Sequence, residues 1–219
     1  MKTRIRPTGM RTVYRLAWHL VRGLSRIYFR LEDVGVANIP LQGPVIFAAN
    51  HVSFLDPPLI GCLVPRTVSF LARHSLFEVP LFGPLIRYLH AVPVDRESGA
   101  AGLRAILNRL HEGAGIILFP EGTRSPDGNL LPAKPGVGMT VLKSTAPVVP
   151  VRICGSFEAF GRTHWFPRPC KVVVCFGTAD GFEDERAEAA TCDKPRLKAL
   201  YQEVSDRLMA RVGALHPEP

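Results

Sequence analysis

Short apolar runs alternate along this chain with stretches of helical periodicity. Buried strands are predicted at residues 45–47, 68–72, 91–94, 115–119, 148–153 and 171–177. Helices are predicted near 57–63, between 98 and 113, around 137–143, and beyond residue 193, where apolar side chains recur at helical spacing. Strands that alternate with helices predict an α/β domain whose central sheet is largely parallel and flanked by helices.

The N-terminal residues 10–31 predict an amphipathic helix. At about 100° per residue, one sector carries the basic side chains, which are Arg11, Arg15, His19, Arg22, Arg26 and Arg30. The opposite side is apolar, with Val13, Leu16, Ala17, Leu20, Val21, Leu24, Ile27, Tyr28 and Leu31, and Trp18 and Phe29 lie near the boundary.

A basic face beside a broad apolar face is typical of a helix that lies in a membrane interface. The alternative is a helix docked on its own domain with solvated arginines. The basic face has no acidic partner within the helix, which favours the membrane. We therefore predict a membrane-associating segment at residues 1–33 and a single domain at residues 34–219.

Charge and cysteine usage restrict the partners and the compartment. A net charge of +8 suits either nucleic acid or an anionic membrane surface. Aromatic side chains are not interleaved with the basic residues of the central region, so nucleic acid is not expected as a partner. Five scattered cysteines without metal-ligand spacing predict reduced thiols and no metal. We expect a peripheral protein on the cytoplasmic face of a membrane.

Candidate catalytic residues follow three of the predicted strands. His51 and Asp56 follow the first strand, Asp95 and Arg96 follow the third, and residues 121–125 follow the fourth. Because parallel strands end at the same edge of a sheet, these groups are predicted to lie together.

The His51 and Asp56 pair has two interpretations. On one continuous helix the two side chains would point about 140° apart, so they cooperate only if the chain turns between them. In that case Asp56 accepts the Nδ1 proton of His51 and leaves Nε2 to act as a base. Alternatively, Asp56 only caps a helix that begins at Pro57, and His51 is an ordinary loop residue.

The other two groups offer features that suit a phosphate. Arg96 and Arg124 present planar forks, Gly122 allows close approach to the backbone, and Thr123 adds a hydroxyl. Each arginine taken alone also fits an exposed loop. Glu121 has no role derived from its position except to order the loop or an arginine by hydrogen bonding.

Four motifs in order resemble the glycerolipid acyltransferases, the family of 1-acylglycerol-3-phosphate acyltransferases. Asn50–Asp56 matches the His-x4-Asp motif, Val92–Arg96 resembles the second block, Phe119–Ser125 the third and Val148–Val151 the fourth. The resemblance implies transfer of a fatty acyl group to the free hydroxyl of a lysophospholipid. It points to 1-acylglycerol-3-phosphate as the acceptor and phosphatidic acid as the product. The donor is implied to be acyl-CoA or acyl carrier protein, a co-substrate, with no cofactor.

The resemblance also implies roles for individual residues. His51 is the expected general base and Asp56 its orienting partner. The glycerol phosphate is expected on Arg96, Glu121, Gly122, Thr123 and Arg124, and the fourth block is expected to shape an acyl pocket. Lys134 stands where many relatives have a more basic stretch, and it is a further possible phosphate contact.

Three alternatives stay open from the sequence. The acceptor could be another lysolipid. The protein could be a lipid-ester hydrolase with Ser53 as nucleophile, although a Gly-x-Ser-x-Gly elbow is missing. It could also be a noncatalytic lipid-binding protein, although the presence of both His51 and Asp56 favours activity.

Overall fold

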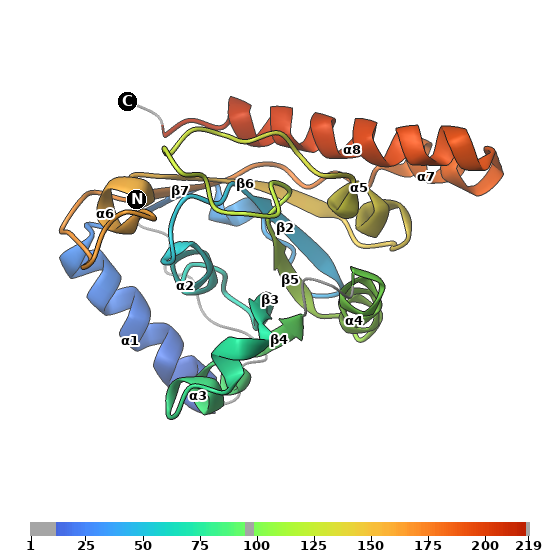
Figure 1. The fold of residues 1–219 in the computed structure, drawn as a ribbon. Coiled ribbons are helices and arrows are strands. Elements are labelled where there is room, and N and C mark those ends of the chain that lie inside the picture. The colour runs from blue at the N-terminus through green and yellow to red at the C-terminus, as the bar shows by residue number, and fades with distance from the viewer. Residues whose placement is uncertain (1–11, 95–98, 218–219) are drawn as a thin grey trace.

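The computed structural model describes residues 12–94 and 99–217, which build a sheet between two layers of helices (Figure 1). In the described chain the sheet has seven strands in the order β1-β7-β6-β2-β5-β3-β4. The strands are β1 Glu32–Val34, β2 Val45–Ala49, β3 Val68–Arg73, β4 Ala91–Val94, β5 Gly115–Leu118, β6 Val148–Cys154 and β7 Val173–Phe176. Only β6 and β7 pair antiparallel within this sheet. The predicted largely parallel sheet is confirmed.

Helices cover both faces of this sheet. They are α1 Thr12–Tyr28, α2 Asp56–Gly61, α3 Phe82–Tyr88, α4 Gly99–His111, α5 Pro135–Leu142, α6 Ser156–Phe160, α7 Glu183–Thr191 and α8 Lys194–Ala214, with 3-10 turns η1 Val36–Asn38 and η2 His74–Phe77. In Figure 1, α5 and α8 lie above the sheet and α1 and α2 lie below it.

The alternating side chains of β2 explain why both faces are covered. Successive strand residues point to opposite faces, so Phe47 packs in one core cluster with Leu59 of α2. Ile46 packs in the other cluster with residues of α4, α5 and α8, including Leu208. All five residues of β2 are buried, which is why its sequence is a continuous apolar run without polar alternation.

Three segments differ from the sequence predictions. Residues 32–34 form β1, which pairs parallel with β7 and contains the predicted boundary after residue 33. No element is predicted for residues 76–86, because their apolar residues follow neither the helix nor the strand period. The structure places the end of η2 and most of α3 there. Residues 183–191 form α7, which has no buried residue and hence no apolar stripe to predict it.

One side of α1 is docked on the domain. Tyr14, Trp18 and Phe29 are buried, and Trp18 Nε1 donates a hydrogen bond to the Val64 carbonyl at 2.8 Å. Arg22 is also buried, 3.6 Å from Asp33, whose carboxylate lies 3.2 Å from Arg26 as well. The basic face has no acidic partner within the helix, as expected, but Arg22 and Arg26 pair with Asp33, which lies beyond the helix.

The outward side of α1 still combines apolar and basic residues. Leu16, Leu20, Leu24 and Ile27 are exposed large hydrophobic residues. The exposed basic residues are Arg15, His19, Arg26 and Arg30. Helix α1 is thus docked through one side and presents an amphipathic surface on the other. Among the described residues, no helix is both long enough and apolar enough to cross a membrane.

Candidate active site

His51 and Asp56 are in direct contact at the carboxyl end of β2. Their Nδ1 and Oδ2 atoms lie 2.8 Å apart. The chain turns between them, and Asp56 is the first residue of α2, while the N-cap residue is Leu55. The capping alternative for Asp56 is therefore wrong, since its carboxylate binds the loop that carries His51.

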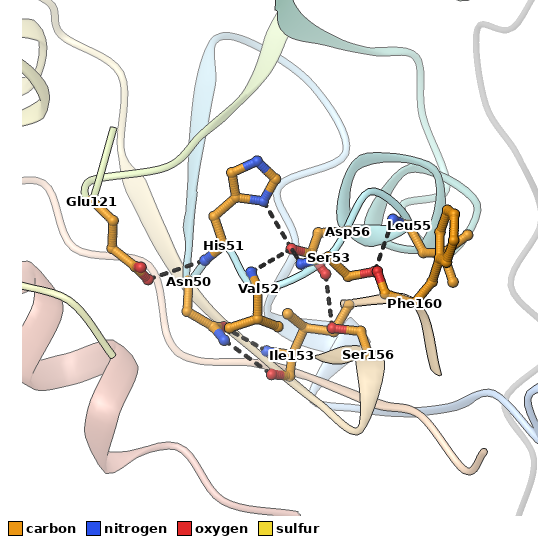
Figure 2. A network of polar contacts seen from close by, with 10 residues as sticks. All are labelled: Asn50, His51, Val52, Ser53, Leu55, Asp56, Glu121, Ile153, Ser156 and Phe160. Carbon is orange, nitrogen blue, oxygen red and sulfur yellow. Dashed lines mark hydrogen bonds and ion pairs between the residues drawn. The ribbon is translucent and has the colours of Figure 1, made fainter. Parts of the chain in front are cut away.

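The Asp56 carboxylate is held by four hydrogen-bond donors (Figure 2). Oδ2 accepts from the backbone N–H groups of Val52 and Ser53 at 2.7 and 2.8 Å, as well as from His51. Oδ1 accepts from the Ser156 hydroxyl at 2.7 Å. The residue is 0% exposed. Hydrogen bonds from these four donors offset the free-energy cost of burying its charge.

The His51 ring is oriented by neighbours on both of its sides. It stacks on Phe119 with the ring centroids 3.9 Å apart and an interplanar angle of 18°. With Asp56 accepting at Nδ1, the proton resides there and Nε2 keeps its lone pair. Figure 2 shows this second ring nitrogen pointing away from Asp56.

The loop after β5 holds the backbone of His51 at two atoms. The His51 N–H donates to Glu121 Oε1 at 3.0 Å, and the His51 carbonyl accepts from Ser125 N–H at 2.8 Å. Two segments that are about 70 residues apart are thereby joined at the site. Of the two roles left open for Glu121, ordering of the loop is the one seen.

Glu121 is a buried carboxyl group next to the His51–Asp56 pair. Burial raises its pKa to about 7, opposed by hydrogen bonds from the backbone N–H groups of His51 and Leu131, while the charge of Asp56 raises it further. The carboxyl group therefore changes protonation near neutral pH, directly behind His51.

Asn50 and Ser53 are structural parts of the same turn. The Asn50 side-chain amide donates to the Ile153 carbonyl at 3.0 Å and accepts from the Ile153 N–H at 2.8 Å, which ties the end of β2 to β6. The fully buried Ser53 hydroxyl donates to the Phe160 carbonyl at 2.7 Å and accepts from Leu55 N–H at 3.1 Å. Both polar side chains are committed to backbone groups.

Arg124 lies beside this pair in a positively charged setting. Its guanidinium carbon is 3.4 Å from the centroid of the Phe54 ring. Burial lowers the pKa of Arg124, and the charges of Arg162 and Arg73 lower it further. Its Nη1 atom is buried and has no hydrogen-bond partner among the described residues. An anion would relieve both the mutual repulsion and this unpaired donor.

The remaining predicted phosphate contacts surround the same loop. Gly122 has φ = 65°, and a Cβ built there would meet Lys134 Cδ at 3.0 Å and Nζ at 3.3 Å, so the lysine side chain lies against this glycine. Thr123 is half-buried in the loop. Asp95 and Arg96 lie outside the described residues, and their strand β4 pairs with β3 so that Val94 is opposite Arg73.

Three functional candidates were missed by the sequence analysis. Arg73 is the last residue of β3, at the same sheet edge as His51, so the strand-end rule could have found it. Ser156 follows β6 but carries no charge to mark it. Arg162 belongs to a loop far from the motifs, and only tertiary structure brings its charge near Arg124.

An apolar cavity of about 70 Å³ lies between α1 and α2. It is lined by Tyr14, Ala17, Trp18, Val21, Pro57, Pro58, Gly61, Cys62, Val68, Phe70 and Leu89. Pro57 and Pro58, which directly follow Asp56 in α2, form part of its wall. The fourth motif, residues 148–151, is buried in the centre of the sheet and does not line this cavity, and its expected part in shaping an acyl pocket stays a prediction.

The fold and the site define an α/β enzyme with a His–Asp pair at the carboxyl edge of its sheet. The sequence model of the Acyltransferase family matches residues 30–154, which is more than half of the chain. This protein therefore belongs to the Acyltransferase family, and the predicted resemblance is confirmed.

Similar proteins carry consistent names. A "1-acyl-sn-glycerol-3-phosphate acyltransferase" of Cocos nucifera is 30% identical over 160 residues, covering 71% of this chain and 52% of that protein. One of Bacillus subtilis is 29% identical over 120 residues, covering 54% and 59%. The chain spans about half the length of the curated relatives it matches.

A solved structure has the same fold over nearly the whole chain. It is the crystal structure of the 1-acyl-sn-glycerophosphate (LPA) acyltransferase PlsC from Thermotoga maritima, with a TM-score of 0.68 and 28% identity. The superposition covers 96% of this chain and 86% of that one. The likeness therefore extends beyond residues 30–154, which the family model matches.

Proposed function

We propose that this protein transfers a fatty acyl group from an acyl thioester to the free hydroxyl of 1-acylglycerol-3-phosphate, giving phosphatidic acid. The observation that carries the proposal is the 2.8 Å contact between His51 Nδ1 and the buried Asp56 carboxylate, with Nε2 directed away from it. The names of the relatives support the choice of acceptor.

The geometry supports general-base catalysis without a covalent enzyme intermediate. Nε2 of His51 takes the proton of the acceptor hydroxyl as its oxygen attacks the thioester carbonyl carbon. The C–O bond forms, the C–S bond breaks, and the thiolate leaves with the proton returned by the imidazolium. Asp56 stabilises that imidazolium and keeps its ring in one orientation.

The acceptor phosphate is assigned to the basic cluster beside His51. Arg124 supplies a buried unpaired donor, and Lys134, Arg73 and Arg162 add positive charge around it. Arg96, Gly122 and Thr123 remain proposed contacts from the motif. A phosphate held there would bring the neighbouring glycerol hydroxyl toward the imidazole.

A peripheral location on the cytoplasmic face of an anionic membrane accompanies this activity in the proposal. Its support is the outward side of α1, where Leu16, Leu20, Leu24 and Ile27 are exposed next to arginines. Both substrates with long acyl chains would be met at such a surface. The donor is acyl-CoA or acyl carrier protein in this proposal.

The hydrolase alternative loses support from the contacts of Ser53. Its hydroxyl is fully buried and already bonded to two backbone groups, Phe160 O and Leu55 N. A nucleophile needs an accessible oxygen within reach of a base. The noncatalytic alternative does not account for the four donors that hold the Asp56 carboxylate against the His51 ring.

The proposal is tested by incubating the protein with a panel of lysolipids and either acyl-CoA or acyl carrier protein loaded with the same chain. Products are identified by mass. We expect an added acyl group on lysophosphatidic acid, with the two donors compared in parallel. Acylation of neutral lysolipids alone would contradict the assigned acceptor, and release of free fatty acid alone would restore the hydrolase.

A further inference from the structure

Residues 161–170 form a loop with two exposed aromatic side chains at its centre. Trp165 is 90% exposed and Phe166 is 79% exposed. Large aromatic groups in water are unfavourable unless something covers them. In the described chain, these are two of the most exposed large hydrophobic residues.

The loop is held in a defined shape, so the exposure is not that of a loose tail. The Gly161 carbonyl accepts from His164 N–H at 3.1 Å, and the Gly161 N–H donates to His164 Nδ1 at 3.1 Å. Arg168 N–H donates to the Ala159 carbonyl at 2.7 Å, which brings the two ends of the loop together. Trp165 and Phe166 are therefore presented at its tip.

Two contacts connect this loop to α1 and to the turn that carries the active site. Its far end lies against α1, because the Tyr28 hydroxyl donates to the Pro167 carbonyl at 2.9 Å. Its near end begins at Phe160, whose carbonyl accepts from Ser53 and whose ring lies 5.5 Å from that of Phe54. In Figure 1 the orange segment after α6 lies near the end of α1. The loop thus bridges the outward side of α1 and the active site.

The charge of the loop identifies the partner. Arg162 and Arg168 are exposed, His164 adds a third basic group, and residues 161–170 contain no Asp or Glu. Trp and Phe beside arginines suit the interface of an anionic bilayer, where rings enter the headgroup boundary and cations meet lipid phosphates.

We infer that Trp165 and Phe166 insert into the membrane surface as a second attachment point, separate from α1, and so hold the mouth of the active site at the lipid interface. This inference rests on the proposed membrane location. Two attachment points fix the orientation of the protein on a bilayer, whereas α1 alone would leave it able to tilt.

The protein contains two tryptophans, which makes insertion directly measurable. Trp18 is 4% exposed and hydrogen-bonded to Val64 O, so its emission is already that of a buried indole. On addition of vesicles with about one third anionic lipid, we expect the emission of the wild-type protein to shift to shorter wavelength. We also expect quenching by lipids brominated on their acyl chains.

The matched variants assign that signal. Trp165→Phe should still bind vesicles but lose the shift. Trp165→Ala combined with Phe166→Ala should weaken vesicle binding at least about tenfold, while Leu41→Ala, an exposed leucine beyond the opposite edge of the sheet, should leave binding unchanged. Thermal unfolding of each variant checks that it is folded.

Activity separates an orienting role from simple adhesion. We expect the double variant to lose at least about fivefold in acylation of lysophosphatidic acid in vesicles, and to keep wild-type activity on a short-chain monomeric acceptor. Two results would overturn this inference but leave the proposed reaction in place. The first is that the wild type binds vesicles without a change in Trp165 emission, and the second is that the double variant binds vesicles as tightly as the wild type. Lack of vesicle binding by the wild type would overturn the membrane location as well, and acylation of the monomeric acceptor reports on the proposed reaction independently.

Discussion

Two regions of the molecule differ in where their side chains find partners: the surroundings of Asp56, and the outer surface formed by α1 and loop 161–170. The Asp56 carboxylate is buried and receives four hydrogen bonds from its own chain. The outer surface leaves Leu20, Ile27 and Trp165 in water. A buried carboxylate whose donors all come from its own chain needs no partner to be ordered, whereas an uncovered apolar surface gains stability only from something outside the chain.

The contrast separates the chemistry from the place where it happens. Changes around Asp56 should reduce turnover for every acceptor, including soluble ones. Changes on the outer surface should matter only when the acceptor is in a bilayer.

Asp56→Asn should have the largest effect. An amide can offer its N–H to His51 Nδ1, which would move the imidazole proton to Nε2 and remove the base. We expect kcat/KM to fall about 10³- to 10⁴-fold, and the free energy of unfolding to fall by about 1–3 kcal/mol. Initial rates and thermal unfolding measure the two losses. Asp206→Asn, at an exposed position of α8, is the control, and a similar loss there would point to general destabilisation.

Glu121→Gln tests the buried carboxyl group behind His51. In the wild type the unfolded carboxyl group loses its proton near pH 4.5 and the folded one near pH 7, so the free energy of unfolding falls as pH rises between these values and then levels. At about 1.4 kcal/mol per pKa unit, this loss is at most about 3.5 kcal/mol. Glutamine does not titrate and still offers an oxygen to His51 N–H. The free energy of unfolding, measured with denaturant from pH 4.5 to 8, should therefore depend less on pH in the variant than in the wild type. The same pH dependence in both proteins would contradict the raised pKa of Glu121.

Arg124→Ala should separate acceptors by their charge. Loss of a charge-assisted hydrogen bond to phosphate corresponds to about 10- to 100-fold in kcat/KM for lysophosphatidic acid, with little change for a neutral lysolipid. Steady-state kinetics on both acceptors measure the ratio. Arg104→Ala, an exposed arginine on α4, should leave both rates unchanged. If Arg124→Ala lowers kcat/KM equally for both acceptors, the residue does not bind the phosphate.

Ser156→Ala should have the smallest effect of the four. It removes one of four donors to Asp56, so the carboxylate stays bonded but less firmly positioned. We expect kcat to fall about three- to tenfold with KM unchanged, because Ser156 acts through Asp56 and not on substrate. Steady-state kinetics with a soluble acceptor provide the two constants. A change in KM alone would mean that Ser156 contacts substrate.

The sequence was sufficient where local patterns carry the information. Apolar runs such as 45–47 and 115–119 predicted the central strands, and polar residues at their ends predicted where His51 and the 121–125 loop meet. The exceptions depend on partners that lie far along the chain. Strand β1 needs β7, Arg22 is buried by its docking and pairs with Asp33, and Ser156 matters only because α6 approaches Asp56.

Helix α1 illustrates the limit of a periodicity argument. A wheel separates apolar from basic positions but does not say which side meets the domain. Trp18 is buried because it packs beside residues of α2 and donates a hydrogen bond to the Val64 carbonyl in the loop after that helix. The exposed leucines lie on the predicted apolar face, whereas two residues of the basic face, Arg22 and Arg26, pair with Asp33, which the wheel does not include.

The central claim is that the imidazole of His51, oriented by Asp56, is the base that activates the acceptor hydroxyl. Its most direct test is the rate at which His51→Ala forms phosphatidic acid from acyl-CoA and lysophosphatidic acid, read by product mass. We expect a fall of about 10²- to 10⁴-fold with vesicle binding and thermal unfolding close to wild type. A variant that keeps more than about a tenth of the wild-type rate would contradict the assignment.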